Sequence, residues 1–182
     1  MLNNLSQQTA DALLALIKMH SNDPRAEKID LGVGVYKTGQ GHTPVFGAIK
    51  AAEKLLLETQ DSKAYLGPEG DMGFVEAIMP YVFGKADPNM GGRIEGMQAP
   101  GGTGSLRLAL AVAKRAGVAK VWMGVPSWPN HAQICDDLGL GMATFNHATP
   151  EGVVDMDALR AALAQAGPDD AELEGLALRL VQ

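Results

Sequence analysis

The 182-residue sequence predicts an α/β fold in which parallel strands alternate with helices. The second half of the chain alternates short apolar runs with stretches of helical periodicity, the pattern of a parallel sheet with helical crossovers. One of these runs, 119–125, is apolar except for a single lysine, as expected of a strand buried on both faces. Glycine- or proline-rich turns follow two of the strands, at the ends where such sheets bind ligands.

The N-terminal part predicts a helix and then an extended segment. Ser6 or Thr9 can cap the helix, and the sequence Asn-Asp-Pro at 22–24 ends it, because the residue before a proline avoids helical backbone. The segment 28–36 is rich in β-branched residues, which favour extended structure. Two glycines interrupt this segment, so it either approaches another group closely or forms a loop at a strand end.

Two further helices and a strand are expected before the centre of the chain. One helix spans 43–58 and begins with a proline, a residue suited to the first helical position. The other spans about 71–83, with an apolar stripe that starts at Phe74 and with Pro80 marking an end or a kink. The segment 93–99 is predicted to be a short strand.

The remaining elements follow in strict alternation. A helix is expected from about 103 to 116, with a glycine at its end, and the strand 119–125 comes next. A helix reaching about 138, a strand over 142–146 and a helix from 155 or 157 to 166 complete the pattern.

Composition excludes several classes of function. The net charge is −6, so the chain has no basic surface for nucleic acid or for a membrane. The apolar run 12–17 is far shorter than the roughly 20 residues that cross a bilayer, and no basic leader suggests a signal peptide. Cys135 is the single cysteine, which agrees with a reducing compartment and predicts a buried, inert thiol. We therefore expect a cytoplasmic protein.

The sequence 99–107, Ala-Pro-Gly-Gly-Thr-Gly-Ser-Leu-Arg, joins a predicted strand to a predicted helix. Unpaired N–H groups and the helix dipole make helix N-termini favourable for anions, and glycines allow a ligand to approach. The stretch is therefore either a phosphate cradle or an ordinary strand-to-helix turn. Arg107 stands where a dinucleotide fingerprint needs glycine, and no P-loop sequence occurs.

A second strand-end loop carries Trp128, Asn130 and His131. An indole near an anion cradle suggests a planar, phosphorylated ligand. Taken singly, Trp128 could be a core aromatic residue and His131 a helix-start histidine bonded to backbone. The combination of the two loops favours a ligand site.

Four motifs in this order and spacing resemble those of the aspartate and aromatic-amino-acid aminotransferases, class-I, fold-type-I pyridoxal-phosphate enzymes. The motifs are Leu-Gly-Val-Gly-Val-Tyr-Lys at 31–37, Tyr-Leu-Gly at 65–67, Pro-Gly-Gly-Thr-Gly at 100–104 and Pro-Ser-Trp-Pro-Asn-His at 126–131. The resemblance covers residues 1 to about 169. It implies an incomplete three-layer α/β sheet from the large domain of this family, with an N-terminal arm.

The resemblance also implies roles for individual residues. Gly102 and Thr103 would bind the phosphate of pyridoxal 5′-phosphate. Trp128 would stack on its ring and bond a substrate carboxylate. His131 would orient the aspartate that pairs with the ring nitrogen. Tyr65 would reach the cofactor of the neighbouring subunit in a homodimer.

The substrates implied by the resemblance are an amino acid, aspartate or aromatic, and a 2-oxo acid. Gly34 would meet the substrate through its backbone. The implied domains are 1–47, the arm and a fragment of the small domain, and 48–170, part of the large cofactor-binding domain. Residues 171–182 match no motif of the family and read as a divergent tail.

One departure from the family bears on activity. The Schiff-base lysine, the carboxylate at the ring nitrogen and the arginine for the substrate carboxylate all lie beyond the matched part in the family. Lys114 and Lys120 read as a helix-end cation and a strand-start residue. We therefore predict an aminotransferase portion that is inactive alone. A non-enzymatic remnant and a phosphate-ligand binding module are the alternatives.

Overall fold

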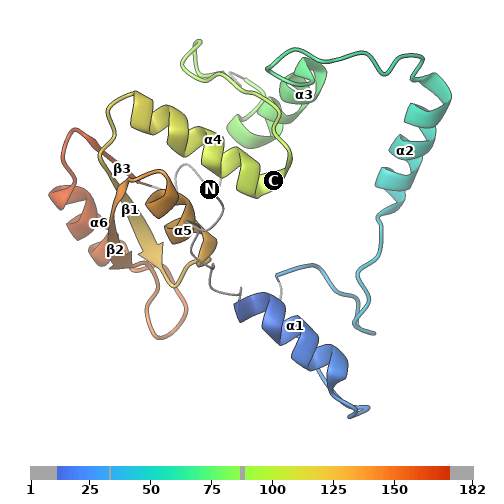
Figure 1. Ribbon diagram of the computed structural model, residues 1–182, viewed down its shortest axis with the longest axis horizontal. Coiled ribbons are helices and arrows are strands. Elements are labelled where there is room, and N and C mark those ends of the chain that lie inside the picture. The colour runs from blue at the N-terminus through green and yellow to red at the C-terminus, as the bar shows by residue number, and fades with distance from the viewer. Residues whose placement is uncertain (1–11, 33, 87–88, 173–182) are drawn as a thin grey trace, which may run out of the picture. The chain divides into compact units, whose positions relative to one another are not determined.

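The computed structural model describes residues 12–32, 34–86 and 89–172 (Figure 1). The chain forms two units, Met1–Ala64 and Tyr65–Gln182. The first unit contains α1 (Ala12–Asn22) and α2 (Gly47–Thr59). The second contains α3 (Met72–Phe83), α4 (Gly101–Arg115), β1 (Lys120–Val125), α5 (Asn130–Asp137), β2 (Gly141–Asn146), α6 (Met156–Gln165) and β3 (Asp170–Glu172).

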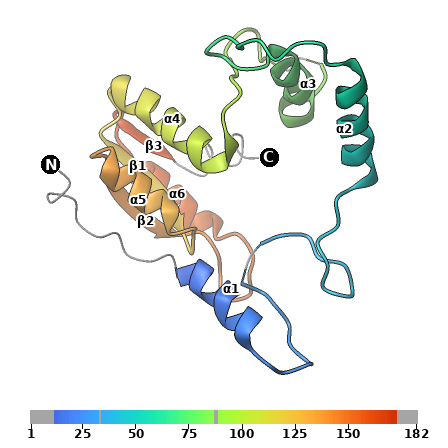
Figure 2. The same ribbon diagram turned by 45° about the vertical axis from the view of Figure 1, so that its right-hand side comes forward.

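The second unit is built on a parallel sheet with the strand order β2-β1-β3. β1 pairs with β2 from Lys120 opposite Gly141 to Val125 opposite Asn146. Its first residues also pair with β3, beginning with Lys120 opposite Asp170. Figures 1 and 2 show α4 and α5 over one face of the sheet and α6 over the other. Helices on both faces are typical of parallel sheets, whose strands are joined by right-handed crossovers. The predicted α/β class with parallel strands is confirmed.

The core of this unit lies between β1 and the helices α4 and α5. Its buried side chains come from these elements and from the turn directly before β2: Leu106, Leu110, Val121, Met123, Ile134, Cys135 and Leu140. Trp122 points to the opposite face of β1, since side chains alternate along a strand, and it is buried too. β1 is thus covered on both faces, as its apolar sequence predicts. Cys135 is only 1% exposed, which confirms the expected buried thiol.

The bounds of the helices and strands from α4 to α6 lie within two residues of the sequence-based expectation. Gly117 ends α4 with a φ of +103°, a left-handed conformation that glycine adopts without strain. Asp155 caps α6, because its side chain accepts a hydrogen bond from the N–H of Ala158 at 2.9 Å. β3 includes Ala171 and Glu172, so the sheet extends into the segment that lacks family motifs.

The strand predicted over 93–99 is wrong, since no strand forms there. The N–H of Gln98 instead donates to the carbonyl of Glu69 at 2.8 Å, and its side-chain oxygen accepts from the N–H of Asp71 at 2.9 Å. These bonds attach the segment to the loop before α3. The helix predicted over about 71–83 is confirmed as α3, whose buried residue is Val75, while Phe74 is 48% exposed.

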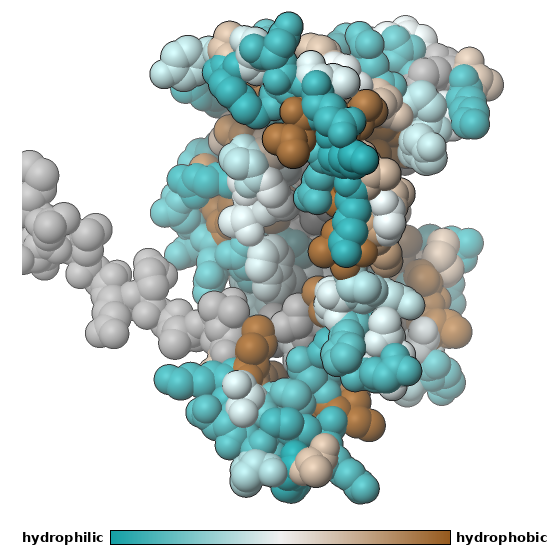
Figure 3. All heavy atoms as spheres, turned by 90° about the vertical axis from the view of Figure 1, so that its right-hand side faces the viewer, coloured by the Kyte–Doolittle hydropathy of each residue, from teal (hydrophilic) through white to brown (hydrophobic). Residues whose placement is uncertain are grey.

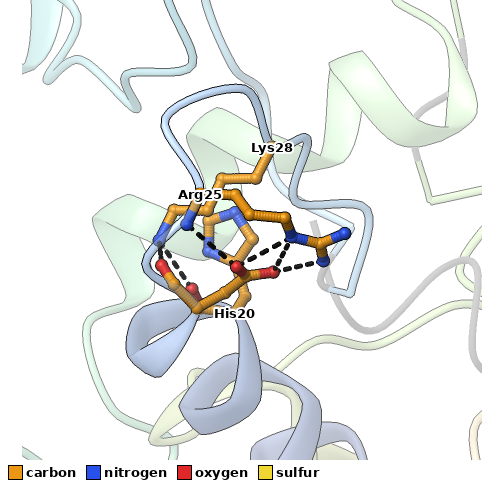
Figure 4. Close-up of polar contacts among 4 residues, drawn as sticks. His20, Arg25 and Lys28 are labelled. Carbon is orange, nitrogen blue, oxygen red and sulfur yellow. Dashed lines mark hydrogen bonds and ion pairs between the residues drawn. The ribbon is translucent and has the colours of Figure 1, made fainter.

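In the first unit, α1 ends at Asn22, as the Asn-Asp-Pro sequence predicts. Figure 4 shows how charged side chains close this end. The ammonium of Lys28 donates to the carbonyls of His20 and Asp23, at 2.8 Å each, and so satisfies carbonyls that lack helical partners. Arg25 pairs with both carboxylate oxygens of Asp23. The N-terminal caps proposed at Ser6 and Thr9 lie outside the described residues.

The segment 28–36 forms no strand in its described residues. Within this segment, the carboxylate of Asp30 accepts from the N–H of Gly32 at 3.0 Å and pairs with Lys37 at 2.6 Å. The predicted start of the next helix is also wrong, because α2 begins at Gly47 rather than at residue 43. α2 contains no buried residue, and Figure 3, which faces the side of α2, shows exposed hydrophobic side chains among hydrophilic ones.

No helix in the described ranges is long and apolar enough to cross a membrane.

Candidate functional site

The N-terminus of α4 has no side-chain cap and no acidic residue in its first turn. Gly101 opens the helix with a φ of +75°, which only glycine adopts readily. Pro100, at the cap position, makes no side-chain cap, and the first turn contains no acidic residue. The hydroxyl of Ser105 donates back to the carbonyl of Gly101 at 2.9 Å. The N–H groups of Gly102 and Thr103 therefore remain at the positive end of the helix dipole, without a side-chain cap.

The turn after β1 holds an aromatic side chain beside a fixed histidine. The indole of Trp128 is 40% exposed, so it is not a core residue. Its ring meets that of His131 edge to face, with centroids 5.6 Å apart. The Nδ1 atom of His131 lies 2.8 Å from the hydroxyl of Ser127, and the backbone N–H of His131 donates to the carbonyl of Trp128 at 3.1 Å. These contacts fix the orientation of the imidazole.

One hydrogen bond joins the two turns. The side-chain amide of Asn130, at the start of α5, donates to the hydroxyl of Thr103 at 3.4 Å. The structure therefore brings the glycine turn with Thr103 next to the turn that carries Trp128 and His131. Both turns stand at helix N-termini, as expected, but only the turn with Trp128 follows a strand, because the strand predicted before the glycine turn does not form.

Two predicted site residues are not brought to this place by any described contact. Tyr65 lies in the loop before α3 and is fully exposed. Gly34 belongs to the first unit, and no described heavy atom lies within 4 Å of where its Cβ would be. The roles of both residues remain predictions.

Sequence reasoning named Asn130 as part of a polar loop but gave it and Ser127 no role in the site. The structure shows that Asn130 contacts Thr103 and that Ser127 contacts His131. The contact between Ser127 and His131 could have been predicted from their four-residue spacing. The contact between Asn130 and Thr103 could not, because these residues are 27 positions apart in the sequence.

The donor set suits a phosphate group. Backbone N–H groups, the hydroxyl of Thr103 and the amide of Asn130 are neutral donors at a helix N-terminus, the arrangement that holds phosphates elsewhere. The exposed indole of Trp128 can take an aromatic ring on its face. The residues present therefore fit a phosphorylated aromatic cofactor. A hollow of about 950 Å³ beside α1 contains none of these residues.

The two lysines nearest the site in sequence have other partners. Lys114 donates to the carbonyl of Leu138, which closes the turn after α5. The ammonium of Lys120 lies 2.9 Å from Asp170 Oδ2 and 5.1 Å from the centre of the Trp122 ring. Neither amine is directed to the glycine turn by these contacts, in agreement with the structural roles predicted for both.

Comparison with known proteins shows one consistent relationship. The family model described as aminotransferase class I and II matches residues 26–179. Tyrosine aminotransferase from Rhizobium meliloti (strain 1021) is 48% identical over 174 residues, which are 95% of this chain and 44% of that protein. Aspartate aminotransferase from Escherichia coli (strain K12) is 38% identical over 176 residues, again 95% and 44%.

Solved structures agree. An aromatic amino acid aminotransferase with 3-indolebutyric acid superposes with a TM-score of 0.79 at 37% identity, covering 94% of this chain and 44% of that one. An aromatic-amino-acid aminotransferase from Burkholderia pseudomallei, covalently bound to pyridoxal phosphate, gives a TM-score of 0.82 at 29% identity, covering 92% and 43%.

The parallel sheet and the two joined turns are thus part of an α/β fold shared with pyridoxal-phosphate-dependent enzymes. The chain belongs to the class I and II aminotransferase family. It spans 44% of the length of the curated relatives compared here. The family match continues to residue 179, beyond the point, near 169, where the motifs become unrecognisable.

Proposed function

We propose that the chain carries the cofactor-phosphate site of an amino-acid aminotransferase that uses pyridoxal 5′-phosphate. The observation that carries this proposal is the Asn130–Thr103 hydrogen bond, because it places the aromatic turn beside the uncapped helix N-terminus. Family membership supports the same reading. The reaction would move an amino group between an aspartate or aromatic amino acid and a 2-oxo acid.

Each residue of the site has a distinct task in this proposal. Gly102 and Thr103 donate N–H and O–H groups to the phosphate, and Asn130 holds the Thr103 hydroxyl in place. Trp128 offers its indole face to the ring. His131, fixed by Ser127, orients the group that meets the ring nitrogen. Pyridoxal phosphate, when bound, supplies the electron-withdrawing ring on which amino-group transfer depends.

The remaining family roles are part of the same proposal. Tyr65, fully exposed in its loop, reaches the cofactor phosphate of a neighbouring subunit in a homodimer. Gly34 meets the substrate through its backbone. Residues 1–47 correspond to the arm and part of the small domain, and 48–170 to part of the large domain, in a cytoplasmic protein.

We further propose that the 182-residue chain does not catalyse transamination by itself. The reaction needs a lysine at the cofactor. Lys114 and Lys120 are held by Leu138 and Asp170, and Lys37 pairs with Asp30. An assay of 2-oxo acid formation from tyrosine or aspartate should give no rate above that of free pyridoxal phosphate. A rate that exceeds this background and saturates with amino acid would contradict the proposal.

Titration with pyridoxal phosphate tests the site directly. The chain has two tryptophans, and the exposed Trp128 should be quenched saturably while the buried Trp122 is affected less. Trp128→Phe should remove most of the quenching. Thr103→Ala should weaken binding about tenfold, because a hydrogen bond to a charged group is lost.

Gln133→Ala, on the exposed side of α5, is the matched control and should bind as the wild type does. Inorganic phosphate should compete for the same site. Absence of saturable quenching up to millimolar pyridoxal phosphate, with the chain folded by circular dichroism, would rule the site out.

A further inference from the structure

Gln98 joins the segment before α4 to the loop before α3. Its backbone N–H donates to the carbonyl of Glu69 at 2.8 Å, and its side-chain Oε1 accepts from the N–H of Asp71 at 2.9 Å. One residue therefore engages both an acceptor and a donor of a short loop that lies 27 positions earlier in the sequence. We call these two hydrogen bonds the Gln98 clasp.

The loop is shaped to fit against Gln98. Gly70 stands between the two bonded loop residues with a φ of +78°, a left-handed conformation that favours glycine. A Cβ added to Gly70 would lie 2.6 Å from the Cβ of Gln98 and 3.1 Å from its carbonyl oxygen. The N–H of Gly70 closes the turn by donating to the carbonyl of Gly67 at 3.0 Å. Only a residue without a side chain lets the loop approach Gln98 this closely.

The clasp also reaches the start of α3. Asp71, whose N–H the Gln98 side chain binds, caps α3 through its carboxylate, which accepts from the N–H of Phe74 at 3.2 Å. The segment before α4 meets α3 a second time at Gly96, where an added Cβ would lie 2.6 Å from Cγ1 of the buried Val75. Segment 93–99 is thus attached to α3 and to its preceding loop, to which Tyr65 belongs.

On its other side, Gln98 is linked to the glycine turn by a short and stiff connection. Only Ala99 and Pro100 separate it from Gly101, the first residue of α4. The N–H of Gly101 donates to the carbonyl of Ala99 at 2.9 Å, and the proline ring fixes the φ of Pro100, here −76°. The place at which Gln98 is held therefore determines where the N–H donors of the first turn of α4 lie.

We propose that Gln98 is a positioning residue for the cofactor-phosphate site. Its clasp holds the donors of Gly102 and Thr103 in place for the phosphate and joins them to the loop of Tyr65. The inference rests on the proposed function, which gives Tyr65 to the cofactor phosphate of a neighbouring subunit. Both phosphate-binding segments of the chain then share one anchor. Coupling between two equilibria is reciprocal, so a phosphate that binds better when the clasp is closed also keeps the clasp closed.

Gln98→Met tests the effect on binding, because it keeps the length of the side chain and removes the acceptor for the N–H of Asp71. Gln98 is exposed, so the variant should keep the circular dichroism spectrum of the wild type. Its pyridoxal-phosphate affinity, measured by Trp128 quenching, should fall about three- to tenfold, the effect of one lost hydrogen bond. Gln133→Met, the same change at an exposed position on α5, is the matched control and should bind as the wild type does.

Amide hydrogen exchange of Asp71 gives a second measure of the coupling. This N–H is bonded to Gln98, so its exchange rate reports the opening of the clasp. Saturating pyridoxal phosphate should slow this exchange in the wild type by the same factor by which Gln98→Met weakens binding, and should not slow it in Gln98→Met. A residue that merely anchored the loop would change the exchange rate without changing the affinity.

A pair of glycine variants opens the clasp from the loop side. Gly70→Ala should separate the loop from Gln98 and weaken pyridoxal-phosphate binding, because the new Cβ would collide with Gln98. Gly92→Ala is its control, since Gly92 has a similar φ of +80° but no described heavy atom beyond its chain neighbours within 4 Å of the added Cβ. Gly92→Ala should therefore leave the affinity unchanged.

Two results would overturn the inference: a folded Gln98→Met that binds pyridoxal phosphate as tightly as the wild type, or equal protection of the Asp71 N–H by the ligand in both proteins. The wild-type titration separates this failure from that of the proposed function. A wild-type chain without saturable quenching removes both, whereas equal binding by the wild type and Gln98→Met removes the positioning role alone.

Discussion

Asp170 accepts three hydrogen bonds at one carboxylate oxygen. The indole N–H of Trp122 donates at 2.8 Å, the N–H of Gly167 at 2.9 Å and the ammonium of Lys120 at 2.9 Å. These donors, the Trp122 indole foremost, lower the pKa of Asp170 to about 2. Because Asp170 begins β3, its carboxylate attaches this short strand to the side chains of β1.

The pH dependence of stability follows from the direction of that shift. The pKa of Asp170 is lower in the folded chain than in the unfolded one, so the stabilisation is complete above about pH 4 and is lost as the pH falls towards 2. Asp170→Asn should be less stable than the wild type at pH 7, and the difference should shrink through this window. Urea unfolding at pH 7, 4 and 2.5 measures it.

Asp23, whose pKa is also lowered to about 2 by Arg25, titrates over the same range in both proteins. The contribution of Asp23 to the pH dependence therefore cancels when the stabilities of the wild type and Asp170→Asn are subtracted. A stability difference that stays constant from pH 7 to 2.5 would show that the charge of Asp170 contributes nothing.

Charge at the helix N-terminus provides a second residue-scale prediction. Asn130→Asp keeps the shape of the side chain but places a carboxylate beside Thr103. It should weaken pyridoxal-phosphate binding by a further factor of roughly ten relative to Asn130→Ala, because like charges repel. Titrations of both variants by Trp128 fluorescence give the comparison. Equal affinities of the two variants would mean that the phosphate binds elsewhere.

At the residue scale, motifs in the sequence name the candidate site residues, and the structure shows the contacts around them. Gly102, Thr103, Trp128 and His131 stand in recognisable strings. The contacts made by Asn130 depend on how two turns meet in space, which no local spacing encodes.

At the scale of the element, α4 offers a test in two glycines of its first turns, Gly101 and Gly104. Gly101→Ala should cost about 1–2 kcal/mol, because its φ of +75° is left-handed and disfavours any Cβ. Gly104→Ala should be neutral or stabilising, since its added Cβ would lie 3.4 Å from Pro100 and alanine favours helix. Urea denaturation of both variants checks the contrast. Equal effects would mean that the turn at Gly101 relaxes.

The two apolar sides of α4 also predict opposite costs. Leu110→Ala removes a fully buried side chain and should lower the free energy of unfolding by about 2–5 kcal/mol. Leu108→Ala, at an exposed position, should change it by less than about 0.5 kcal/mol. Thermal or urea unfolding distinguishes them. A large loss of stability from Leu108→Ala would contradict the exposure of this side chain.

Elements from α4 to α6 were predictable because their signals are local: caps, glycine ends and apolar periodicity. The strand predicted over 93–99 was not, because a strand forms only when a neighbour accepts its hydrogen bonds. Gln98 found its partners in the loop at Glu69 and Asp71. The segment 28–36 shows the same dependence, since β-branched residues alone did not create a strand.

For the whole molecule, stability should be concentrated in the second unit. The buried cluster comes from residues 106–140, whereas α2 has no buried residue. Amide hydrogen exchange should therefore be slowest in β1 and α4 and close to that of an unfolded peptide in α2. Mass spectrometry of exchanged fragments provides the measurement. Strong protection of α2 in the chain alone would contradict this order of stability.

The reactivity of Cys135 provides a chemical measure of the stability of the buried cluster. The thiol is 1% exposed, and burial raises its pKa, so an aromatic disulfide reagent can attack only when the cluster around it separates. The chain contains no other cysteine. The rate of thiol labelling, followed by the absorbance of the released reagent, therefore measures how often α5 separates from β1. A ligand that binds across these elements should slow the labelling of Cys135, and a tighter ligand should slow it more.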